Sequence, residues 1–197
     1  MNYNQKVQEK VFKKYITHGI NENVKVTNIE KVSGDKEGTV WKAFDITFSN
    51  GESELKTRIF QFKYRPGATD FKGNILDEAT QESDYLKRIK HLFSKVVGDS
   101  DKYDEYISKV AGTTDAEQFD SLTDVLESIV KSDTKPFRLL CIDNKKGYPK
   151  VPDWNSGFAE SMEVNPTKLT FNEAKYGKPK LPEATEVISS SPQGLTF

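Results

Sequence analysis

With 197 residues, the chain is long enough for one domain that buries about 70% of its unfolded surface, so a stable core needs no covalent cross-link. The single cysteine, Cys141, excludes an internal disulfide, and the lack of an apolar run of ~18 residues or of a secretory signal leads us to expect a cytoplasmic protein with no membrane partner. The formal net charge of −1 excludes a uniformly basic surface, but residues 1–75 and 135–182 each carry +4 while residues 76–134 carry −7, so two basic segments flank an acidic one.

The first half of the chain is predicted to be mostly strand. Residues 1–18 contain apolar side chains at helical spacing among lysines, which indicates either a short helix or a basic arm. Three strand patterns follow at 23–32, 39–48 and 54–64. Because the turn-rich stretches GDKEG and SNGES join them, these strands are predicted to form an antiparallel meander.

The third of these strands has an unusual mixture of side chains. Alternation places two cations and three aromatic rings on one face: Lys56, Arg58, Phe60, Phe62 and Tyr64. Such a strip suits single-stranded nucleic acid, in which cations meet phosphates and rings stack on unpaired bases. Alternatively, the rings belong to the core and the cations emerge at its rim. Leu55 and Ile59, on the opposite face, favour burial of that opposite face.

A loop and a helical segment come next. Residues 65–74 contain Pro66 and two glycines, and this predicted loop either overhangs a binding groove or is an ordinary surface connection. From residue 77 the apolar period changes to 3.6, which predicts three helices, the last over about 116–131. This helical segment contains the acidic part of the chain.

The end of the chain returns to strand and then loses its apolar residues. A strand is predicted at 136–143, followed by short β-prone pieces interrupted by prolines. Residues 182–197 are rich in Pro, Ser, Thr and Glu, so they are predicted to be a flexible tail.

This order of elements predicts an α+β, mostly β fold. Three meandering strands, a helical segment and further strands match the antiparallel five-stranded oligonucleotide-binding barrel, in which the ligand crosses strands two and three. We therefore predict an OB-fold-like domain over 19–181, with an enlarged helical segment at about 77–131 between strands three and four. A generic α+β fold with helices on one face of a sheet and a different small barrel are the alternatives.

Three stretches resemble a known family: GINENVKV (19–26), YLKRIKHLF (85–93) and KKGYPKVPDW…GFAE (145–160). They are similar to the single-stranded DNA-binding proteins of tailed bacteriophages, including crAss-like phages. The resemblance implies a non-enzymatic OB-fold protein that coats unwound DNA during replication or recombination. Many single-stranded DNA-binding proteins recruit replication proteins through an acidic tail with a terminal Phe; this chain has Phe197 there, but its tail carries only two acids.

The expected function is sequence-tolerant binding of single-stranded DNA, without cofactor or metal. Trp41, set apart from the apolar row of the second strand, joins Phe60, Phe62 and Tyr64 as a stacking candidate. The cations expected to meet phosphates are Lys42, Lys56, Arg58, Lys63, Arg65 and Lys72, extended by Lys145, Lys146 and Lys150. Because two faces of one strand cannot both touch the ligand, part of this set must lie elsewhere.

Two other classes of function remain open. Pro152-Asp153 followed by Glu173-Ala174-Lys175 spells a PD…ExK pattern, typical of Mg²⁺-dependent nucleases. That chemistry requires Asp153 and Glu173 on neighbouring strands, whereas Asp153 is expected in a proline-bounded loop. The third class is a non-catalytic virion or interaction protein that docks through its helices.

Overall fold

Three long strands form the centre of the fold. The computed structural model of the protein describes residues 14–132 and 134–177. In it β2 (Gly19–Lys36), β3 (Thr39–Ser49) and β4 (Ser53–Phe60) are antiparallel neighbours, as predicted. Glu37 and Gly38, which join β2 to β3, both have positive φ (55° and 78°), the backbone that tight twisted hairpins require.

The ends of the chain are described only in part. Of the predicted helix or basic arm over 1–18, residues 1–13 lie outside the described residues, and β1 (Lys14–Tyr15) pairs in parallel with the first residues of β4. The predicted tail over 182–197 also lies outside the described residues.

The remaining strands extend the sheet from β2. Register shifts near Asn21 and Val26 allow β2 to pair with β5 (Phe137–Asp143) through its first residues and with β3 through the rest. β5 also pairs with the short strands β6 (Pro149–Lys150) and β7 (Ala159–Ser161). The order is β1-β4-β3-β2-β5-β6, with β7 on β5.

The α+β class is confirmed, but a closed five-stranded barrel is not seen. Within the described ranges β4 pairs with β1 and β3, so the sheet stays open between β4 and β6. These two strands nevertheless lie close to each other.

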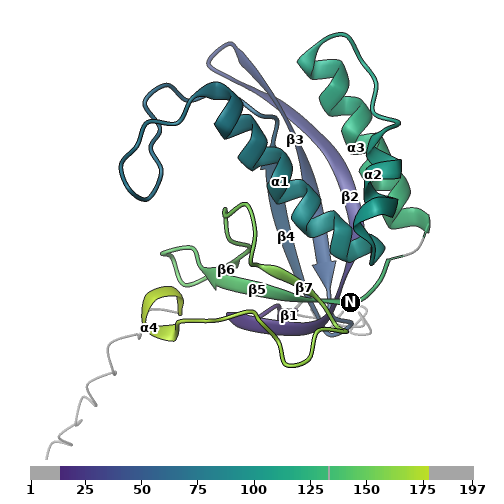
Figure 1. Cartoon of the computed structure of the whole chain (residues 1–197), viewed down its shortest axis with the longest axis vertical. Coiled ribbons are helices and arrows are strands. Elements are labelled where there is room, and N and C mark those ends of the chain that lie inside the picture. Colours follow the sequence, from purple (N-terminus) through teal and green to yellow (C-terminus); the bar gives the residue numbers. More distant parts are fainter. Residues whose placement is uncertain (1–13, 133, 178–197) are drawn as a thin grey trace, which may run out of the picture.

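The three predicted helices are present as α1 (Glu78–Val97), α2 (Ser100–Ile107) and α3 (Asp115–Ser132), and a one-turn helix, α4 (Glu173–Tyr176), follows near the end. The carboxylate of Asp77 accepts the N–H of Thr80 at 2.8 Å and caps α1. Figure 1 shows α1, α2 and α3 together on one side of the long strands.

The helices bury the inner face of the sheet. Phe44 and Phe48 of β3 are fully buried there, and Phe44 stacks on Phe119 of α3 with ring centroids 5.7 Å apart. Leu55 and Ile59 of β4 are buried on the same face, which is the one that these two residues favoured where the sequence left both faces open. The other face of β4 therefore remains available for binding.

The core also contains the lone thiol. Cys141 of β5 is buried, as predicted, and this burial raises its pKa to about 12. A thiol with such a pKa stays protonated near neutral pH and is a poor nucleophile.

Candidate nucleic-acid interface

Three predicted binding residues contact one another on the outer face of the sheet: Trp41 of β3 and Arg58 and Phe60 of β4. The rings of Trp41 and Phe60 meet edge to face with centroids 5.6 Å apart, and Arg58 lies 5.4 Å from the centre of the Trp41 ring. Trp41 rests on Gly34 of β2, where an added Cβ would lie 2.5 Å from the indole. Phe60 remains 53% exposed. We call Trp41, Arg58 and Phe60 the aromatic platform.

The cations of this face already have protein partners. Arg58 donates to both carboxylate oxygens of Asp45, at 2.7 and 2.9 Å. Lys56 lies 3.2 Å from Asp45 and 3.0 Å from Glu30. The hydrogen bond from Arg58 holds the pKa of Asp45 below its usual range although burial opposes this. Lys56 and Arg58, both predicted to meet phosphates, are thus committed to ion pairs that a phosphate would have to displace.

Two other predicted binding residues lie away from the platform. Lys42 projects to the helix side of β3, where its ammonium is 2.5 Å from Asp120 of α3. Lys42 is two residues from Phe44, so alternation along the strand already placed both side chains on the same face. Phe62 lies beyond the last residue of β4 and packs against Tyr85 of α1, with centroids 5.8 Å apart. The predicted strand over 54–64 was therefore too long by four residues.

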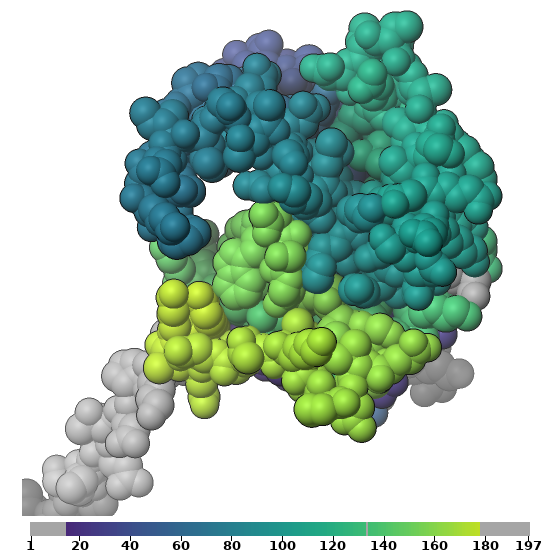
Figure 2. All heavy atoms as spheres, viewed as in Figure 1, coloured from purple at the N-terminus to yellow at the C-terminus, as the bar shows by residue number. Residues whose placement is uncertain are grey.

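Beyond β4 the chain forms a projecting loop over residues 61–77. Figure 1 shows it reaching away from the rest of the fold before α1 begins, and Figure 2 shows an opening between this blue-teal loop and the green segment that follows β5. The loop is held at its base by Gln81 of α1, which accepts the N–H of Arg65 at 3.1 Å and donates to its carbonyl at 3.0 Å.

The opposite wall of the opening, residues 144–155, is attached to the same helix. Asn155 donates to Asp84 of α1 at 2.9 Å, and Arg88 of α1 donates to the carbonyl of Pro152 at 2.9 Å. Because α1 holds both walls within a few turns, the helix determines the spacing between them.

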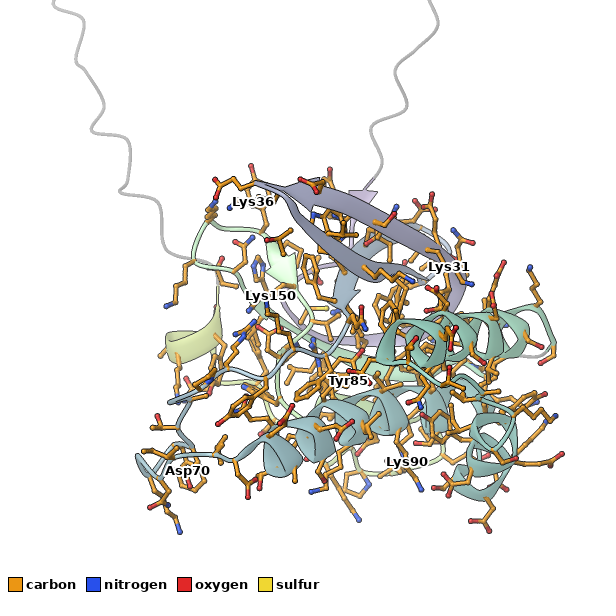
Figure 3. All side chains as sticks on the ribbon, turned by 90° about the horizontal axis from the view of Figure 1, so that it is seen from above. Lys31, Lys36, Asp70, Tyr85, Lys90 and Lys150 are labelled. Carbon is orange, nitrogen blue, oxygen red and sulfur yellow. The ribbon has the colours of Figure 1, made fainter. Side chains whose placement is uncertain are left out.

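The walls carry the unpaired cations of the predicted set. Five of the predicted residues are exposed and have no ion-pair partner in the part of the chain that the structure describes: Lys63, Arg65, Lys72, Lys145 and Lys146. Lys150 pairs with Asp153 at 2.6 Å, and Tyr64 is half-buried at the start of the loop. In Figure 3, Lys150 lies between the hairpin tip at Lys36 and the loop that holds Asp70.

The predicted binding set omitted three aromatic residues near these cations. Phe71 is 94%, Tyr148 61% and Trp154 37% exposed. Trp154 meets Tyr176 of α4 edge to face, with centroids 5.4 Å apart. The sequence contains a pattern that indicates two of them, Tyr148 and Trp154, because KKGYPKVPDW mixes lysines and aromatic residues much as residues 55–64 do.

His91 has a structural role that the sequence did not reveal. Its Nε2 atom accepts the N–H groups of Gly157 at 3.1 Å and Ala159 at 3.2 Å, which ties α1 to β7. Burial and the nearby charge of Lys95 lower the pKa of His91. The neutral imidazole is therefore the form that suits this contact.

The geometry of a PD…ExK nuclease is not found. Asp153 lies in irregular chain after β6, paired with Lys150 and Arg88, and Glu173 opens α4. Neither carboxylate is on a strand. Among the described residues there is also no cluster of three or more His, Cys, Asp or Glu side chains that suits a metal ion, and no helix there has the length and apolarity of a membrane span.

Comparisons with known protein families, with curated proteins and with solved structures return no match for this chain.

Proposed function

We propose that the protein binds single-stranded DNA along a path from the aromatic platform to the opening beside residues 61–77. The observation that carries the proposal is the set of five unpaired cations on the two walls of the opening, close to exposed aromatic rings. Since β4 ends at Phe60 and the loop begins at the next residue, the chain runs from the platform into the loop on one side of the opening. Cations and rings along one path are what an unpaired strand requires.

The charge distribution supports an unpaired strand over duplex DNA. The acids of the helical segment would repel a second phosphate backbone, and rings such as Phe60 can stack only on bases that are not already stacked. On the helix side of the sheet, Lys42 and Lys31 are neutralised by acids of α3. The predicted cations that remain unpaired therefore belong to the segments on the two sides of the opening.

We also propose that the sheet is an opened form of the oligonucleotide-binding (OB) barrel. β2 pairs with both β3 and β5, as the first strand of that barrel does, and the helical segment follows the third strand of the meander. On this reading β3 and β4 are the strands that a nucleic acid crosses, which agrees with the position of the platform. The role in phage replication and recruitment through residues 182–197 rest on the family resemblance alone.

Fluorescence titration with oligo-dT, oligo-U and duplex DNA, with and without Mg²⁺, tests this function. We expect oligo-dT to bind without cleavage, with a log–log salt slope of about −3.5 if all five unpaired cations meet phosphates. No binding of oligo-dT, or tighter binding of the duplex, would refute the proposal. Mg²⁺-dependent products would favour the nuclease instead.

An interaction protein is the second candidate, because the helices enclose an apolar hollow of about 160 Å³. Its lining includes Phe62, Tyr85, Leu86 and Leu122. The hydroxyl of Tyr85 is buried without a hydrogen-bond partner among the described residues, so it remains free for one. If the protein does not bind DNA, this hollow is the candidate site for a protein partner.

A further inference from the structure

Phe71 is the most exposed large apolar residue in the described part of the chain. Its ring is 94% exposed, and Lys72 lies 5.5 Å from the centre of the ring. Exposed aromatic rings of this kind commonly mark binding surfaces, because their burial against a partner is strongly favourable.

The turn that carries Phe71 is tightly constrained by Asp70. The carboxylate of Asp70 accepts the backbone N–H groups of Lys72 at 2.8 Å and Asn74 at 2.9 Å, and also the side-chain amide of Asn74 at 2.9 Å. These hydrogen bonds from Asn74 lower the pKa of Asp70, so its carboxylate stays charged and bonded near neutral pH. A bridge between Thr69 and Ile75 closes the turn.

A turn with a constrained backbone loses less conformational freedom on binding than a mobile one, so this turn is preorganised for contact. Figure 3 places Asp70 at the outer end of the loop, away from the core. Phe71 is therefore held outside the core by polar contacts, with its ring available to a partner.

We propose that Phe71 is a stacking finger that packs its ring against a base of single-stranded DNA bound in the opening. Lys72 then meets the adjacent phosphate. The loop supplies further positive charge through Lys63 and Arg65, both unpaired among the described residues, so a polyanion suits this wall better than an apolar surface does. The inference rests on the proposed function and adds a binding residue to it.

Substitution of Phe71 gives the first test. Phe71→Ala should weaken oligo-dT binding about 5- to 150-fold, the range for loss of one base–aromatic stack. Phe71→Tyr, which keeps the ring, should bind nearly as tightly as the wild type. Tyr15→Ala is the matched control, since Tyr15 is an aromatic residue of β1 that is 67% exposed and pairs with the start of β4, at the other end of that strand from Phe60. The affinity of this variant should equal that of the wild type.

Asp70→Ala tests the positioning role of the turn. It retains Phe71 but removes the hydrogen bonds that hold the turn, so affinity should fall while the unfolding temperature changes little. Unchanged affinity in this variant would contradict the positioning role.

Photo-crosslinking of the wild-type protein to oligo-dT containing 5-bromodeoxyuridine, followed by peptide mass spectrometry, gives a test that needs no variant. An adduct at Phe71 supports the finger. If oligo-dT binds but Phe71 carries no adduct and Phe71→Ala binds normally, the finger is refuted and the proposed function survives. If the wild type does not bind oligo-dT, the proposed function fails, and the finger fails with it.

Discussion

Replacing Lys145 and Lys146 by glutamine tests whether the walls of the opening, rather than the overall charge, attract the ligand. Both side chains are exposed in the turn after β5 and lack ion-pair partners in the described ranges, so no internal contact opposes their use by phosphate. The double variant removes two of the five unpaired cations.

The expected magnitude follows from counterion release. Each phosphate engaged on a single strand contributes about 0.7 to the log–log salt slope, so the slope should change from about −3.5 to about −2.1. If the wild type and the double variant have equal affinities at about 1 M salt, the loss of these two contacts lowers the affinity of the variant about 25-fold at about 0.1 M salt. The assay is titration of fluorescent oligo-dT at several salt concentrations between these limits.

A control of equal charge separates local from overall effects. Lys102 and Lys109 lie in the acidic helical segment, and their double replacement by glutamine changes the net charge by the same amount. The slope of this control should equal that of the wild type. Equal slope changes in both double variants, or no change at Lys145 and Lys146, would refute the reasoning.

Three further predictions concern single residues. Phe60→Ala should weaken oligo-dT binding about 5- to 150-fold and hardly lower the melting temperature, because the ring is 53% exposed; a large fall in melting temperature at unchanged affinity would instead identify Phe60 as a core residue. The folded pKa of Asp45 lies below the unfolded value of about 3.9, so its ion pair stabilises the protein above about pH 4 and this contribution falls as the pH falls further. Urea unfolding should accordingly show a loss in Asp45→Asn at about pH 7 that shrinks at about pH 3, whereas an equal loss at both would exclude the ion pair as its source. The folded pKa of His91 is also depressed, so the stabilising contribution of His91 is complete above the unfolded pKa of about 6.5 and decreases as the pH falls below it. The melting temperature of His91→Gln should therefore depend less on pH than that of the wild type between about pH 7.5 and about pH 5. An unaltered pH dependence would contradict this.

Local periodicity was sufficient to predict much of the fold. The meander and the three helices follow from alternation and from the 3.6-residue repeat, whereas alternation left both faces of the strand over 54–64 as candidates for burial. The end of β4 was not predictable in this way, because residues 61–64 keep an alternating pattern although strand pairing stops at Phe60.

The candidate site was harder to predict from the sequence than the fold was. Lys42 and Arg58 are both cations in strands, but Lys42 is neutralised by Asp120, 78 residues away, and Arg58 by Asp45 on the neighbouring strand. No local pattern encodes such pairings, because they depend on which segments meet after folding.

The sequence by itself determined which segments are mostly strand or helix and where charge is concentrated, because these properties depend on residues a few positions apart. Only the tertiary structure decided that the sheet stays open between β4 and β6, which cations are already paired, and that residues 61–77 and 144–155 face each other across an opening held by α1. Those features depend on contacts between distant segments, whose geometry is established when the core between sheet and helices packs.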